Sequence, residues 1–555
     1  MAQARFRDIR TLIAALSQSL PVSLRGDDMV SVLSPIEVRT AAADSGAYRR
    51  AASLLGSVRH QWALSQSPLA GVDSWPLCNI CHDVTRSPCP DAFQMSVDEG
   101  DFMKSLSTRI AGLVVGVAVV AAVGAATSRN AQAVLPPLPN TVQQWNKIAE
   151  DTVVGSGAFQ GEGEIYMSYT SLAVYDAVVA IRGGYEPYGP AISAPAGASL
   201  DCAVVEAAYR TLRHYFSTFP TLVANLDAYY SEALSPSNLN GCTGDAGKGT
   251  SVGLAAANSI IALRTGDGRL TPVGTTSAFE TKAPGPGVWR LTPPQFLVPQ
   301  TPWLGSVQPF LLKSPGQFRP QPPVPLSSTE WVKQFNEVKA YGGVNSTVRT
   351  SDETATARFY TANVIRQFNV AARDLATARA LDELQTARLV AMVNAVSADA
   401  LMSALNAKYR FLFWRPVTAI DPASVSADGF GPVPGFNDGN PATIEEPGWR
   451  PLITTPNHPE YPAAHGTNTS AMAEVFSEFL GTDDIDLDIH GFDAAGAAGN
   501  LDAVHHFDTA EQLREEVINA RLWGGIHYRR SSEAGVHLGL KVAHYGLLHA
   551  FKPVH

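Results

Sequence analysis

The sequence predicts a mainly helical protein, and two observations support this prediction. From Val134 onward, apolar residues recur at intervals of three and four, the spacing that places them on one face of a helix. Proline and glycine are concentrated in two long stretches, 265–325 and 421–459, which we expect to be connecting loops. The chain has 45% hydrophobic and 17% charged residues, which favours a soluble globular protein with a large core.

The helices are expected in two halves, separated by the first loop. The N-terminal half, 134–264, has helical periodicity at 141–150, 162–182, 200–216, 221–234 and 246–264. Residues 265–327 follow as a Pro- and Gly-rich wrapping loop over the surface. The C-terminal half, 328–555, is expected to have helices at 328–341, 352–369, 372–412, from 466 onward, from 508 onward and at 532–550.

The first 133 residues differ from the rest of the chain. Residues 1–102 lack sustained periodicity, and we expect them to be a poorly structured upstream extension that precedes the working start at Met103. Residues 103–133 have the features of a secretory signal peptide: basic residues at Lys104 and Arg109, a short apolar run, and a final Ala-Gln-Ala. The alternative, a membrane anchor, is less favoured because the run is short and rich in Ala and Gly. We therefore expect cleavage after residue 133, a periplasmic or secreted protein, and no membrane association in the mature form.

The net charge of the chain limits the partners that it can bind. The formal net charge of −10 argues against binding to nucleic acid or to an acidic membrane surface. Any anion site must therefore be built locally from clustered cations.

Cys202 and Cys242 are the two cysteines after residue 133, and either one disulfide or two separate buried thiols fits the sequence.

Three segments of the C-terminal half supply cations and imidazoles that could form an anion site. Lys408 and Arg415 come first, His465 ends the segment His-Pro-Glu-Tyr-Pro-Ala-Ala-His, and Arg521 is followed six residues later by His527. Guanidinium groups bind anion oxygens through planar forks, and lysine adds a point charge. The set is suited to enclosing a phosphate-like oxyanion.

Helix geometry adds two expectations. Lys408 and Arg415 are seven residues apart, so on one continuing helix that stops at Pro416 they would share a face. Arg521 and His527 would lie about 120° apart on a straight helix. We expect Gly524-Gly525 to provide close helix packing or the distortion that brings both side chains to the anion.

The three segments together resemble the signature of vanadium-dependent haloperoxidases and of their relatives, the type-2 phosphatidic-acid phosphatases and bacterial non-specific acid phosphatases. The pattern reads Lys-x6-Arg-Pro, Pro-x-x-His and Arg-x5-His, and it covers the C-terminal third of the chain. The segment from Tyr169 to Tyr188 is also similar to the N-terminal part of bacterial members. The resemblance implies an all-α fold of helical bundles joined by long loops.

The same resemblance implies a role for each site residue. His527 Nε2 would be the ligand to vanadium, His465 the acid-base group that handles hydrogen peroxide, and Lys408 the group that polarises the bound peroxide. The residues that hold the vanadate oxygens would be Lys408, Arg415 and Arg521, with Ala464 at the cofactor and His527 as its covalent anchor. Hydrogen peroxide, a halide and a small organic acceptor are the implied partners, and an oligomer is compatible with the sequence.

Two positions depart from the family pattern. Ala463 replaces a serine whose hydroxyl contacts the oxyanion, which removes one hydrogen bond to a charged group, about 1.5–3 kcal/mol. Ser531 replaces the aspartate four residues after the metal-binding histidine, so we expect the partner that orients His527 to be missing. A phosphatase needs that partner more than a vanadate ligand does, because its histidine must act as a nucleophile.

The sequence leaves three functions to compare. A vanadate-dependent haloperoxidase is the main prediction, with bromide favoured because His458 stands where the family differs between chloride- and bromide-oxidising members. A loop histidine without that role is an equally weighted interpretation of His458. The alternatives are phosphomonoester hydrolysis in the same pocket and a non-catalytic oxyanion-binding protein.

Overall fold

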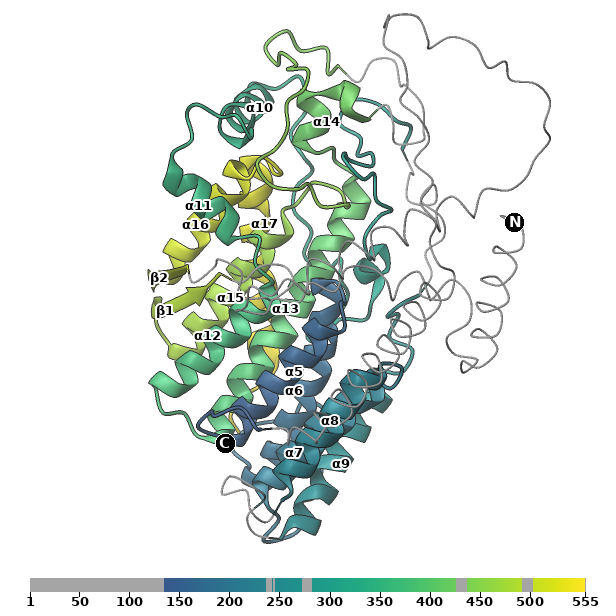
Figure 1. Cartoon of the computed structure of the whole chain (residues 1–555), viewed down its shortest axis with the longest axis vertical. Coiled ribbons are helices and arrows are strands. Elements are labelled where there is room, and N and C mark those ends of the chain that lie inside the picture. Colours follow the sequence, from purple (N-terminus) through teal and green to yellow (C-terminus); the bar gives the residue numbers. More distant parts are fainter. Residues whose placement is uncertain are drawn as a thin grey trace, which may run out of the picture. The chain divides into compact units, whose positions relative to one another are not determined.

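The structure is a computed structural model that describes residues 134–235, 242, 245–271, 282–425, 437–491 and 503–554 (Figure 1). The upstream extension and the signal peptide, expected at 1–133, lie outside the described residues. The described part is helical apart from one small sheet, as the sequence predicts. Its first half contains α5 (Thr141–Gly155), α6 (Gln160–Arg182), α7 (Leu200–Tyr215), α8 (Pro220–Ala233) and α9 (Ala246–Leu263).

The loop between the halves has little regular structure. Within its described residues, 265–271 and 282–327, it contains a single 3₁₀ turn, η3 (Pro302–Ser306). The second half contains α10 (Thr329–Gly342), α11 (Ser351–Phe359), α12 (Val364–Ala378), α13 (Glu383–Phe411), α14 (Pro416–Ile420), η4 (Pro422–Val425), α15 (Ala464–Leu480), α16 (Ala510–Trp523) and α17 (Arg529–His549).

The small sheet was not predicted. Strands β1 (Asp484–His490) and β2 (Val504–Thr509) pair antiparallel beside α12, α15 and α16 (Figure 1). Along β1 buried and exposed residues alternate, so one face packs on the helices. The sheet leaves the all-α class of the protein intact.

Helix α13 is the central element of the described fold. It contacts α5, α6, α12, α15 and α17, and most of its residues are buried around its whole circumference. Among the described helices it alone is long and apolar enough to span a membrane, but 94% of its apolar window is buried inside the protein. A helix that is apolar on all sides and packed in this way is the core of a bundle.

Two helix breaks differ from the prediction and matter for the site. Predicted helix 352–369 is interrupted between α11 and α12, where Asn363 accepts a hydrogen bond from the Ile365 N–H and starts α12. Predicted helix 372–412 begins only at α13, where Asp382 and Gln385 form a capping box. Local caps therefore divide a region whose apolar periodicity reads as continuous.

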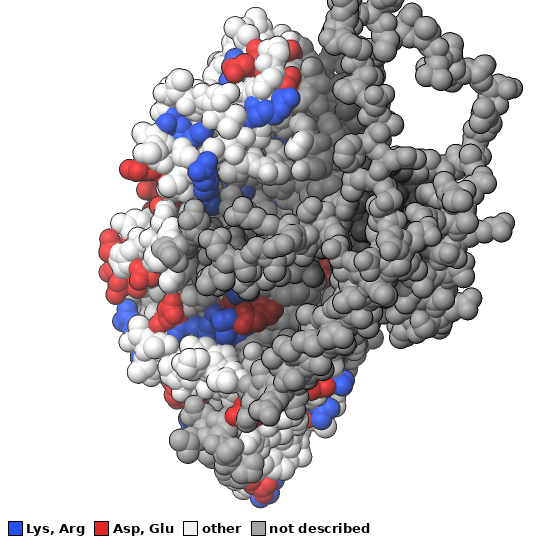
Figure 2. Space-filling view, viewed as in Figure 1, with Lys and Arg blue, Asp and Glu red and all other residues white. Residues whose placement is uncertain are grey.

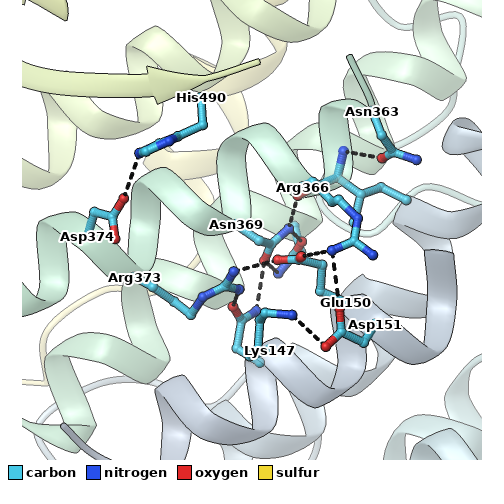
Figure 3. Close-up of polar contacts among 12 residues, drawn as sticks. Lys147, Glu150, Asp151, Asn363, Arg366, Asn369, Arg373, Asp374 and His490 are labelled. Carbon is cyan, nitrogen blue, oxygen red and sulfur yellow. Dashed lines mark hydrogen bonds and ion pairs between the residues drawn. The ribbon is translucent and has the colours of Figure 1, made fainter. Parts of the chain in front are cut away.

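Helix α12 is fixed to α5 by a buried polar network (Figure 3). Glu150 accepts hydrogen bonds from Arg373 (2.6 Å) and Arg366 (2.9 Å), and Asn146 bonds both Arg373 and Asn369. Removing one partner of such a network leaves a buried charge unpaired and costs roughly 3–5 kcal/mol. The network holds the start of α12, including Asn363, at the side of the cavity described below.

Helices α15 and α17 pack closely because glycines stand at their contact. A Cβ atom at Gly535 would lie 2.5 Å from the Ala463 carbonyl oxygen, and one at Gly539 would overlap the Thr467 carbonyl oxygen. The main chain of α17 therefore touches the first turn of α15 directly. This contact fixes the position of His465, which lies in that turn.

Candidate oxyanion site

Lys408 and Arg415 meet at the segment that precedes α15, but they do not share a helix. Helix α13 ends at Phe411, Leu412 has left-handed backbone angles, and Arg415 precedes α14. The expectation of one continuing helix is therefore wrong. The two cations converge because each donates to main-chain carbonyls of the same segment: Lys408 Nζ to Pro459 O and Glu460 O (both 2.9 Å), and Arg415 Nε to His458 O (3.0 Å).

His527 is held in one tautomer by its two neighbours. Its Nδ1 lies 2.9 Å from Glu460 Oε1, which also accepts the Tyr528 N–H at 3.1 Å, so Nδ1 carries the proton. Its Nε2 lies 3.2 Å from Arg415 Nη1, and a guanidinium can only donate, so Nε2 presents a lone pair. The neutral ring with a free Nε2 lone pair is the form that binds a metal or attacks an electrophile.

Glu460 corrects the expectation that the orienting partner of His527 is missing. Ser531, at the position where the family pattern has an aspartate, is buried and donates to the Glu460 carbonyl oxygen at 3.5 Å. The carboxylate at His527 Nδ1 comes from the Glu460 side chain instead. Sequence reasoning missed Glu460 although it stands inside the segment from His458 to His465. Its signal was available: a carboxylate in an otherwise apolar stretch between two histidines needs a buried cationic or N–H partner.

Arg521 reaches the site from the end of α16. Its Nη1 donates to the Tyr360 carbonyl (2.7 Å), which is free to accept because the chain turns between α11 and α12. The expected distortion at Gly524-Gly525 is present: α16 ends at Trp523, and Gly525 has a φ of 74°. A Cβ atom at Gly525 would overlap the Gly342 carbonyl oxygen, so the turn that separates Arg521 from His527 requires glycine.

These residues border a cavity of about 370 Å³. The predicted residues on its wall are His458, Ala464, His465, Arg521 and His527. Lys408 and Arg415 lie directly behind that wall, and the fully buried Ala463 is not among the lining residues. The rest of the wall is mostly apolar and is contributed by Ala158, Phe159, Gln160, Gly161, Gln300, Tyr360, Thr361, Asn363, Val364, Leu401, Leu405, Ile453, Thr454, Pro456 and Asn468.

The electrostatics of the site favour a bound anion. Burial lowers the pKa of Arg521 to about 9 and of Arg415 to about 10, and it lowers the pKa of Lys408 well below its usual range. Burial and the three cations also lower the pKa of His465 and His527 well below the usual value, so both rings are neutral. Burial raises the pKa of Glu460 to about 7, against the lowering effect of Arg415 and Lys408. A multivalent anion would stabilise all three cations at once.

The donors present fit a tetrahedral oxyanion. Three buried nitrogen atoms of cavity residues have no hydrogen-bond partner in the described structure: His465 Nε2, Asn468 Nδ2 and Arg521 Nε. Arg415 uses its N–H groups on carbonyls and on the ring nitrogens of His458 and His527. Arg415 Nη1, at 3.2 Å from His527 Nε2, is therefore close to any oxyanion bound at that nitrogen.

The positive charge is local to this site. Figure 2 shows Lys and Arg side chains interspersed with Asp and Glu over the visible described surface. An anion is therefore selected by the buried cations and not by a broad basic surface. This agrees with the net charge of −10.

Comparisons with known proteins give one matching family model and several solved structures with a similar fold. Residues 388–555 match the family model described as the VCPO second helical-bundle domain. A solved bacterial vanadium-dependent iodoperoxidase is similar at 20% identity and a TM-score of 0.60, covering 76% of this chain and 99% of that one. A bacterial vanadium-dependent chloroperoxidase is similar in its apo form (17% identity, TM-score 0.51, 70% of this chain and 94% of that one) and in its holo form (18%, 0.50, 76% and 95%). Comparison with curated protein sequences gives no match.

Proposed function

We propose that this chain is a vanadium-dependent haloperoxidase and that it oxidises halide with hydrogen peroxide using vanadate. The family model matched at residues 388–555 and the similar fold support the proposal. The observation that carries the proposal is the His527 ring. It is neutral, oriented by Glu460, and presents its Nε2 lone pair beside the buried Arg415 at the cavity that Arg521 also lines. A lone pair surrounded by cations suits a metal oxyanion that needs one nitrogen ligand and several hydrogen-bond donors.

Each site residue has a proposed role around the cofactor. Vanadate, when bound, supplies Lewis-acid activation of hydrogen peroxide. His527 Nε2 is the proposed metal ligand, and Lys408, Arg415 and Arg521 are the proposed donors to its oxygens. His465 is neutral and its Nε2 has no partner in the described structure, so it is placed to take and return a proton at the cavity.

The finer proposals concern the halide and the acceptor. His458 lies on the cavity wall, and its Nδ1 accepts from Arg415 Nη2 at 3.0 Å, which leaves the Nε2–H available to the cavity. The alternative contact of Nδ1, with Pro459 O at 3.2 Å, is longer and lacks the guanidinium charge. Bromide is the proposed halide, and the mostly apolar wall favours a small apolar organic acceptor.

Phosphomonoester hydrolysis is the second candidate, and the Glu460 contact favours it. A carboxylate on Nδ1 is what a nucleophilic histidine requires, so the argument against a phosphatase that rests on Ser531 no longer holds. In that reaction His527 Nε2 would attack phosphorus. His465, protonated from solvent once the bound anion offsets the three cations, would protonate the leaving oxygen.

Export to the periplasm or the medium is also proposed. Cys202 and Cys242 form a disulfide, which resolves the alternative that the sequence left open. A disulfide favours an oxidising compartment and is compatible with the expected signal peptide.

The experiment measures bromination of a dye by the full-length protein with peroxide and bromide, before and after orthovanadate is added, alongside hydrolysis of an aryl phosphate. Vanadate-dependent bromination supports the proposal, whereas hydrolysis that vanadate inhibits, without bromination, assigns the protein to the phosphatases. His527→Ala should abolish vanadate binding, and His465→Ala should retain binding but lose turnover. His537→Ala, an exposed histidine on α17, is the control. Equal loss of binding in both site variants would contradict the assigned roles.

A further inference from the structure

Asn468 is a buried polar residue on the cavity wall that the predicted site does not include. It lies on α15, three residues after His465, and its side chain is fully buried. Its Oδ1 accepts a hydrogen bond from Ser397 Oγ at 2.8 Å, while its Nδ2 has no partner among the described residues. A buried amide N–H without an acceptor is costly, so the cavity is where its acceptor is expected.

The orientation of this amide is set from the opposite side by a chain of two residues. Ser397 on α13 contacts the carboxyl group of Glu164, which lies on α6 and is almost completely buried. Ser397 uses its single proton on Asn468 Oδ1, so its oxygen is left to accept at the Glu164 side. Burial raises the pKa of Glu164 to about 8, although the Ser397 contact lowers it, so the carboxyl group is protonated at neutral pH. The NH₂ end of Asn468 is then left for the cavity.

We propose that the Asn468 amide is an additional hydrogen-bond donor to the bound oxyanion, positioned by Ser397 and Glu164. The inference rests on the proposed function, in that the oxyanion is the vanadate or phosphate held at His527. Asn468 and His465 occupy one face of the first turns of α15, and the unpartnered nitrogen atoms of both residues and of Arg521 border the same cavity.

This assignment also accounts for Ala463. The serine of the family pattern is absent, and Ala463 is fully buried away from the cavity wall. Asn468, one turn further into α15, supplies an N–H group from the same helix. The lost donor is thereby replaced from a neighbouring position.

Inorganic phosphate and orthovanadate are the probes, and their affinities for the full-length protein are measured by calorimetry. Asn468→Ala should weaken both affinities by about 10- to 100-fold, the effect of one hydrogen bond to a charged group. Asn468→Asp should weaken them further because it places a carboxylate beside the anion. Asn336→Asp, an exposed asparagine on α10, is the matched control and should leave both unchanged.

The positioning chain is tested separately. Ser397→Ala should weaken phosphate binding, whereas Glu164→Gln should retain it because the glutamine amide still donates to Ser397. Glu164→Met, which cannot donate, should weaken it.

The anion affinity of the folded variant separates this role from a structural one. Asn468→Ala removes the unpaired donor and also the acceptor of Ser397 Oγ, so its thermal midpoint should fall whichever role Asn468 has. A lowered midpoint with unchanged anion affinity would assign Asn468 to packing and overturn the inference. Wild-type protein that binds neither anion overturns it as well, together with the proposed function. Anion binding that depends on Asn468, without any halide oxidation, supports the inference and refutes only the haloperoxidase proposal.

Discussion

Replacing Glu460 with glutamine tests whether this carboxylate orients His527. Oε1 accepts two N–H groups, from His527 Nδ1 at 2.9 Å and from the Tyr528 main chain at 3.1 Å. Glutamine keeps an oxygen acceptor but removes its charge. A hydrogen bond to a charged group contributes about 1.5–3 kcal/mol and a neutral one about 0.5–1.5 kcal/mol, so the His527 bond should weaken by roughly 1–2 kcal/mol.

The expected result is a vanadate affinity lowered by about 10-fold, within the range of about 10- to 100-fold for lost partners of metal-bound histidines. The affinity is measured by calorimetry on the apo protein, with phosphate as a second anion. Phosphate forms no bond to Nε2 and should lose less than vanadate does. Glu478→Gln, on the exposed face of α15, is the control.

Unchanged vanadate affinity in a folded Glu460→Gln protein would refute this reasoning. It would mean that the position of His527 is set by its packing and by Arg415 Nη1 at 3.2 Å, without help from the carboxylate. An equal loss for phosphate and vanadate would show that Glu460 acts through the general charge of the site. Orientation of Nε2 would then be excluded as the cause.

Three further predictions concern stability. Ser531→Asp should lower the free energy of unfolding by roughly 3 kcal/mol, because it buries a second carboxylate beside Glu460. Thermal melts should show a smaller loss of stability when Ser531→Asp is combined with Glu460→Gln. Glu164 has a pKa raised by burial from 4.5 to about 8, so the folded protein retains a proton that the unfolded chain releases. This group should therefore lower the unfolding free energy as pH rises from about 4.5 to 8, by up to about 1.4 kcal/mol per pH unit, and denaturant titrations of Glu164→Gln should show a fall that is smaller by this contribution. Reduction of the Cys202–Cys242 disulfide, which spans 40 residues, should cost roughly 4 kcal/mol, and an unchanged melting temperature with reductant would contradict this.

The helical class could be predicted from the sequence, and so could most of the cations and histidines that the structure brings together at one cavity. Apolar spacing of three and four marks a buried helix face wherever it occurs, so α6, α7 and α9 lie close to their expected ranges. The cations and histidines were recognisable because few other side chains can hold a buried oxyanion. Gly524-Gly525 also indicated close helix packing or a distortion before His527, since glycine adopts the backbone angles that other residues avoid.

Only the tertiary structure decided how these residues meet. Lys408 and Arg415 converge because both bind carbonyls of the segment before α15, and no spacing along one helix describes that contact. Glu460 reaches His527 across 67 positions of sequence, and Ser397 reaches Asn468 across 71. Periodicity reports the face of an element that is buried, whereas the partner of a buried polar group depends on which elements pack together. The sequence alone therefore determined the chemistry available to the site, and the packing of α13, α15 and α17 determined which atoms border the cavity.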